Sequence, residues 1–65
     1  MEAMKAQFLG KEVVVYPGDT HIKFGKVLDI NEVGVTFLAT NTAGMWKKNT
    51  VNFIAFSANL KFAIM

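Results

Sequence analysis

The sequence predicts a mainly all-β fold, a small α+β domain. One N-terminal helix precedes five short strands that form a strongly bent antiparallel, SH3-like barrel. A length of 65 residues allows one domain, residues 1–65, close to the lower size limit for independent folding. After Gly10, runs of β-branched and aromatic residues alternate with short turn segments, which is typical of a small all-β fold. The chain has no repeat, linker or low-complexity segment that would divide it.

Residues 2–9 predict the helix. Met4 and Phe8 fall near one face, Glu2 stands at the start, and Gly10 provides a stop signal at the C-terminal end. A helix this short is not stable alone, so we expect it to dock on the strands.

Five strands are expected after the helix. They are predicted at residues 11–16, 22–30, 33–40, 45–56 and 59–65, with turns at 17–21, 31–32 and 41–44 and a kink at 57–59. The turn assignments follow from residue types such as Pro17-Gly18, which suit the two central positions of a turn. Alternation predicts two faces, one with Ile22, Phe24, Leu28 and Ile30 in the second strand and one with Val33, Val35, Phe37 and Ala39 in the third.

The C-terminal segment, residues 49–65, is apolar on both faces and carries a single charged residue, Lys61. Strands at the edge of a sheet usually carry charges or proline that prevent other chains from pairing with them. Either the N-terminal helix or a neighbouring subunit must therefore cover these strands. We favour a neighbouring subunit, because both terminal strands lack such protection and because 52% of the residues are hydrophobic.

Several functional classes have little support. The chain has no cysteine and one histidine, His21, so no disulfide, cysteine-type zinc site or histidine cluster is expected, and no metal or other cofactor. No pair of carboxylates, no serine–histidine arrangement and no glycine-rich phosphate loop is recognisable, so we do not expect an enzyme. Without a secretory leader or a membrane-spanning run, a cytoplasmic protein is expected.

The segment FGKVLDINEVGVTFL resembles the first conserved segment of the Sm and Sm-like proteins, which include bacterial Hfq. That segment has a glycine in the second strand, an apolar residue two positions later, an acidic or amide residue at the next turn, and then an apolar strand. The corresponding residues are Gly25, Val27, Asn31 and the range 33–38. The segment MWKKNTVNFIAF resembles the family's fourth strand, where a basic or polar cluster precedes an apolar strand. The resemblance extends from Phe8 to about Ile64, and another SH3-like barrel remains the alternative.

The resemblance implies a homo-oligomeric ring, a hexamer or heptamer, in which the fourth strand of one subunit pairs with the fifth strand of the next. Such a contact is heterologous, and its rotation closes. The implied interface residues come from the two strands that lack edge protection. They are Val51, Phe53, Ile54, Phe56, Leu60 and Phe62.

The resemblance also implies binding of single-stranded RNA near the pore of the ring. The implied RNA-binding residues are Lys47, Lys48, Asn49, Asn31, Glu32 and Val33. The match is mixed, because the family has a base-stacking residue and an asparagine at the positions of Val33 and Val35. Trp46 could stack on a base, but packing is the commoner role of such a tryptophan. The alternative function is an oligomeric structural or protein-interaction module that has lost nucleotide recognition.

Overall fold

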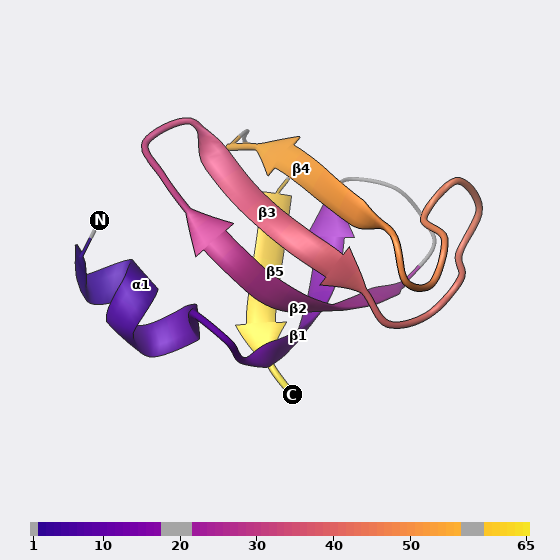
Figure 1. Cartoon of the computed structure of the whole chain (residues 1–65), viewed down its shortest axis with the longest axis horizontal. Helices are drawn as coiled ribbons and strands as arrows, with labels where there is room; N and C mark the ends of the chain where they lie inside the picture. The colour runs from indigo at the N-terminus through magenta and orange to yellow at the C-terminus, as the bar shows by residue number, and fades with distance from the viewer. Residues whose placement is uncertain (1, 18–21, 57–59) are drawn as a thin grey trace.

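The computed structural model describes residues 2–17, 22–56 and 60–65 as a short helix followed by one bent antiparallel sheet (Figure 1). The elements are α1 (Glu2–Phe8), β1 (Glu12–Pro17), β2 (Lys23–Ile30), β3 (Gly34–Ala39), β4 (Val51–Ala55) and β5 (Leu60–Ile64). The strand order is β4-β3-β2-β1-β5, and every neighbouring pair is antiparallel. The predicted helix and five-strand pattern is therefore confirmed, but β4 and β5 are the two edges of the sheet and are not paired with each other. The predicted kink at 57–59 and most of the turn at 17–21 lie outside the described residues.

The fourth strand is shorter than the sequence pattern predicts. It begins at Val51, whereas the sequence pattern predicts a strand over residues 45–56. Residues 45–50 instead belong to the loop between β3 and β4, because two tight turns bend the backbone there.

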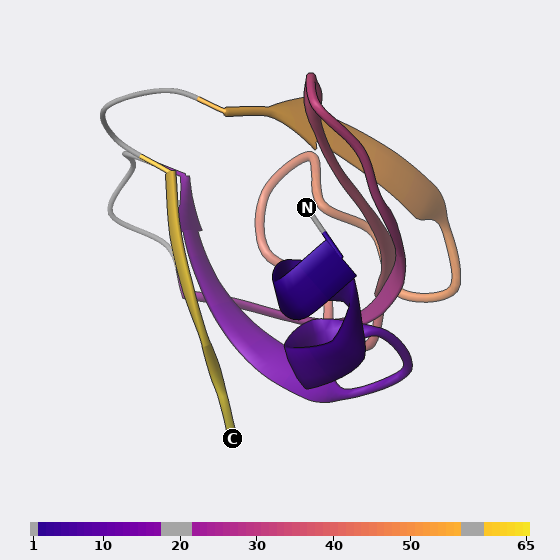
Figure 2. The same ribbon diagram turned by 90° about the vertical axis from the view of Figure 1, so that its left-hand side faces the viewer.

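Helix α1 docks on the sheet as expected. Met4 and Phe8 pack against the core, and the Phe8 ring meets the Phe62 ring edge to face with centroids 4.9 Å apart. The helix lies over one open end of the curved sheet (Figure 2). Its Lys5 Nζ lies 3.8 Å from Asp29 Oδ1, an exposed pair that contributes little to stability.

A β-bulge in β2 changes which side chains of this strand are buried. The register with β3 shifts between Val27 and Asp29, so Val27 and Ile30 both face the core while Leu28 is exposed. The prediction that Ile22, Phe24, Leu28 and Ile30 share one face is wrong for Ile30, which is buried whereas Ile22 and Leu28 are exposed, because strict alternation does not survive the extra residue. The third strand follows its pattern, since Val35, Phe37 and Ala39 are all fully buried, but Val33 precedes the strand and is exposed.

One hydrophobic cluster, drawn from β1, β2, β3 and the β3–β4 loop, forms the core of the curved sheet that Figure 2 shows. Phe37 is its largest fully buried side chain, and its ring contacts those of Trp46 and Phe62 with centroids 5.9 and 5.7 Å apart. The buried hydrophobic residues are Val13, Val15, Val27, Ile30, Val35, Phe37, Ala39 and Trp46. Their partly buried neighbours include Ile54 of β4 and Leu60 of β5, so both edge strands contribute to one core.

Gly34 lies too close to the backbone of β4 to carry a side chain. A Cβ placed on Gly34 would lie 2.3 Å from the Ile54 carbonyl oxygen and 2.7 Å from the Ala55 Cα. Both atoms belong to the backbone, so the strands would have to separate to accommodate a side chain. The start of β3 therefore tolerates no residue larger than glycine.

We predict that Gly34→Ala lowers the free energy of unfolding by about 3 kcal/mol, because the added methyl group overlaps the backbone of β4. Urea denaturation measures the loss. Gly44→Ala is the matched control, since a Cβ at Gly44 meets no atom within 4 Å and the cost there comes from its φ of 62° alone, about 1 kcal/mol. Equal losses in the two variants would contradict this account of Gly34.

Candidate nucleic-acid interface

The loop between β3 and β4, residues 40–50, contains a tight hairpin. Ala43 and Trp46 form an isolated antiparallel bridge, in which Ala43 N donates to Trp46 O at 2.8 Å and Trp46 N to Ala43 O at 3.1 Å. Met45 stands at the tip of this hairpin with 95% of its surface exposed. The sequence pattern placed Met45 inside a strand, and only the turn geometry reveals it as a tip.

Trp46 anchors the hairpin to the sheet. Its side chain is 4% exposed, and its Cζ2 lies 3.0 Å from the position that a Cβ on Gly25 would take. Its Nε1 donates a hydrogen bond to the Phe24 carbonyl oxygen at 3.1 Å. Trp46 therefore packs in the core, which is the commoner of the two roles considered for it. Its buried ring cannot stack on a nucleobase.

Lys47, Lys48 and Asn49 lie in a second turn that follows directly. Thr50 N donates to the Lys47 carbonyl oxygen at 3.1 Å, and Asn49 takes a φ of 71° at the third position, as in a type II turn. Asparagine tolerates this backbone conformation, which gives Asn49 a structural role as well as the predicted binding role. All three side chains are exposed, and residues 40–50 contain no acidic residue.

The turn between β2 and β3 holds the other predicted RNA-binding residues. Asn31 Oδ1 accepts hydrogen bonds from Val33 N at 2.8 Å and Gly34 N at 3.0 Å, so this oxygen stabilises the turn. Glu32 and Val33 are exposed. Val35, where the family resemblance implies a base-reading asparagine, is fully buried and cannot reach a ligand.

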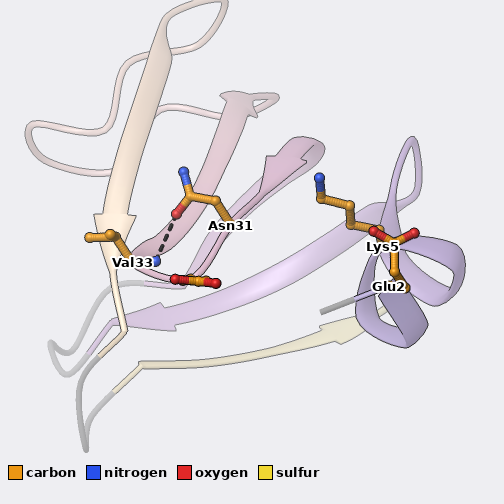
Figure 3. Close-up of a pocket in the computed structure, with 5 residues that line it drawn as sticks. Glu2, Lys5, Asn31 and Val33 are labelled. Atoms are coloured by element: carbon orange, nitrogen blue, oxygen red, sulfur yellow. Dashed lines mark hydrogen bonds between the residues drawn. The ribbon is translucent and has the colours of Figure 1, made fainter.

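An open pocket of about 490 Å³ lies between α1 and this turn (Figure 3). Its lining residues are Glu2, Lys5, Asn31, Glu32 and Val33. The two carboxylates outnumber the one lysine, which also lies close to Asp29. A phosphate group would therefore be repelled at this end of the molecule.

The two groups of predicted RNA-binding residues lie at opposite ends of the β3–β4 pair. Leu38 pairs with Val51 beside the loop, whereas Gly34 pairs with Ala55 beside the turn. A strand of this length spans roughly 17–20 Å. In Figure 1 the loop projects at one end of the molecule, while the turn and α1 lie at the other. Within one chain, the structure thus does not join residues 47–49 to residues 31–33 in a single site.

The predicted interface residues lie on the two edge strands and the residue after β4. Val51 and Phe53 are 64% and 50% exposed, and Phe56 is also exposed. Ile54, Leu60 and Phe62 are half-buried, because their side chains reach the core. An isolated protomer consequently leaves large apolar side chains open to water along β4.

Comparison of the chain with known protein families, with curated proteins and with solved structures gives no match. Across residues 2–17, 22–56 and 60–65, no helix is long and apolar enough to cross a membrane. The same residues hold no group of three or more His, Cys, Asp or Glu side chains that could bind a metal ion.

We predict that Trp46→Phe lowers the free energy of unfolding by about 2 kcal/mol, because it removes the hydrogen bond to Phe24 and part of the buried ring. Thermal and urea unfolding measure this loss. Tyr16→Phe is the control, since Tyr16 is exposed on β1 and the change should be nearly neutral. A Trp46→Phe variant as stable as the parent would contradict the anchoring role.

Proposed function

We propose that the chain is an Sm-like protein that assembles into a homo-oligomeric ring and binds single-stranded RNA. The strand order carries the proposal, because β4-β3-β2-β1-β5 leaves β4 and β5 as the two edges of one bent sheet. Lys61 is the one charged residue in these two strands. Edges this apolar and this poorly protected favour pairing with another chain.

The proposed contact pairs β4 of one subunit with β5 of the next. Phe56 N donates to the Val33 carbonyl oxygen, so antiparallel alternation directs the backbone groups of Phe53 away from β3 and toward the free edge. Pairing there would also cover the half-buried side chains of Ile54 and Phe62. The contact joins two different surfaces, and repetition through six or seven subunits closes a ring.

The proposed RNA contact lies at the β3–β4 loop. Lys47 and Lys48 are exposed in a loop without acidic residues, so their ammonium groups are available to phosphates. A ring multiplies these two charges by the number of subunits, and the loop then favours a polyanion over a single phosphate. The turn with Glu32 and Val33 contributes less, because it offers a negative charge and no aromatic ring.

A second candidate is an oligomeric interaction module of the same fold without nucleotide recognition. The burial of Val35 favours this candidate, because the position that reads uracil in the family resemblance is closed here. Both candidates share the ring, and they differ in whether the loop lysines bind RNA.

We predict that the native mass of the protein at micromolar concentration is six or seven times that of the 7.2 kDa chain. Phe53→Pro should convert the assembly to smaller species, because proline removes a backbone donor at the free edge of β4. Phe53→Ala is the control, since it removes the side chain but keeps the donor, and it should retain more of the assembly. A monomeric parent protein in native mass spectrometry would refute the ring.

We predict that Lys47→Ala/Lys48→Ala lowers the affinity for oligo-U and oligo-A at least tenfold at low salt and flattens the salt dependence. Each lost phosphate contact removes about 0.7 from the slope of log affinity against log salt for a single strand. Lys5→Ala/Lys11→Ala is the control, because it makes the same charge change away from the loop. Fluorescence anisotropy at two salt concentrations measures both quantities. If the parent binds neither oligonucleotide at low salt, the interaction-module candidate replaces RNA binding.

A further inference from the structure

We propose that Met45 is an RNA-contacting residue, on which an unstacked base of the single strand packs while Lys47 and Lys48 hold the neighbouring phosphates. This inference rests on the proposed function and deepens it. It adds a contact that the family resemblance does not supply, and it predicts selection of single strands over duplexes with little dependence on base identity.

Met45 is held out into solvent at the tip of the hairpin. Among the described residues it is the most exposed large hydrophobic side chain, at 95%, so it contributes almost nothing to the core. Its position is nevertheless well defined, because the Ala43–Trp46 bridge closes the hairpin and the buried Trp46 ties it to the sheet. Because the backbone of the tip is already fixed, a ligand that covers Met45 has to order only its side chain.

Several polar side chains of the loop are held in hydrogen bonds within the protein. Asn41 Oδ1 accepts from Phe24 N at 2.8 Å, Thr42 Oγ1 accepts from Lys48 N at 3.2 Å, and Thr50 Oγ1 donates to the Lys47 carbonyl oxygen. These side chains are therefore engaged in holding the loop.

The groups that remain exposed and uncommitted are the Met45 thioether, the ammonium groups of Lys47 and Lys48, and the Asn49 amide. Ammonium groups bind phosphate, and a thioether packs against the flat face of an aromatic ring. The Asn49 amide can both donate to and accept from the edge of a base, whereas the lysines can only donate to it. The set thus fits the backbone and base faces of a flexible strand, with at most a small base preference.

An anionic membrane surface has a similar charge but fits the loop less well. Tryptophan is the side chain enriched at membrane interfaces, and Trp46 is buried in the core. One exposed methionine and two lysines per loop are a small anchor, since stable membrane binding needs several such signals. A single base needs only one apolar platform, which Met45 provides.

The test compares Met45→Ser with Met45→Leu and with Leu9→Ser, which makes the same kind of polar change at an exposed position beside α1. The probes are fluorescent oligo-U, oligo-A and a duplex RNA of equal length, each titrated at two salt concentrations. Met45→Ser should lower the affinity for single strands roughly two- to tenfold, the range of a thioether–aromatic contact, without changing the salt slope. Met45→Leu should retain the affinity, because it keeps the apolar surface, and duplex binding should not change in any variant. The urea midpoint of Met45→Ser should equal that of the parent.

Three results would overturn the inference while leaving RNA binding by the lysines intact. They are an unchanged single-strand affinity in Met45→Ser, an equal loss for the duplex, or a preference of the parent for one oligonucleotide of more than about tenfold. Sedimentation with phosphatidylserine vesicles tests the membrane alternative. If Met45→Ser abolishes vesicle binding but leaves the RNA affinity unchanged, Met45 contacts a lipid surface and not RNA. A parent that binds no RNA at low salt would instead remove the proposed function and the inference together.

Discussion

The packing of Trp46 on Gly25 is the contact on which the rest of the structure depends most. The indole ring needs the space that glycine leaves in β2, and its Nε1 needs the Phe24 carbonyl oxygen beside it. With these two contacts the β3–β4 loop completes the core instead of leaving it open at that end. The same contacts set the positions of every exposed group on the loop, because Met45 precedes Trp46 and Lys47 follows it directly. Stability and the candidate binding surface therefore share one side chain.

The bend of the sheet also determines what happens at its two edges. Gly34 allows β3 and β4 to approach closely, and the bulge near Leu28 turns β2 so that both Val27 and Ile30 reach the core. The sheet curves around this core but β4 does not meet β5 within the protomer. In the described part of the chain, α1 occupies one end of the curve, and no strand pairs with the outer side of β4 or β5. The proposed self-association through these edges would remove apolar surface from water.

Carboxylates predominate at one end of the protomer, where Lys5 is their basic neighbour, and two lysines stand at the other end. Glu2, Asp29 and Glu32 gather around α1 and the β2–β3 turn, whereas Lys47 and Lys48 lie on the β3–β4 loop without an acidic neighbour in that loop. Repetition of this arrangement around a ring would give one face that attracts a polyanion and one that repels it. Any RNA bound to such an assembly would then lie on the loop side, an orientation that the net charge of +2 does not suggest.

The sequence alone determined the helix, the number of strands and the two poorly protected edges, because these depend on local periodicity, turn residues and missing charges. The strand order places β4 and β5 at the two edges of the sheet. The boundaries of the fourth strand and the buried face of β2 were decided by tertiary structure. Residues 45–50 are predicted as strand, but the Ala43–Trp46 bridge and the turn closed by Thr50 N and the Lys47 carbonyl oxygen place them in the loop. A bulge also has no signal in alternation until the strands are paired. The separation of residues 31–33 from residues 47–49 likewise follows from the direction of β3 and β4, since two segments near in sequence lie at opposite ends of an antiparallel pair.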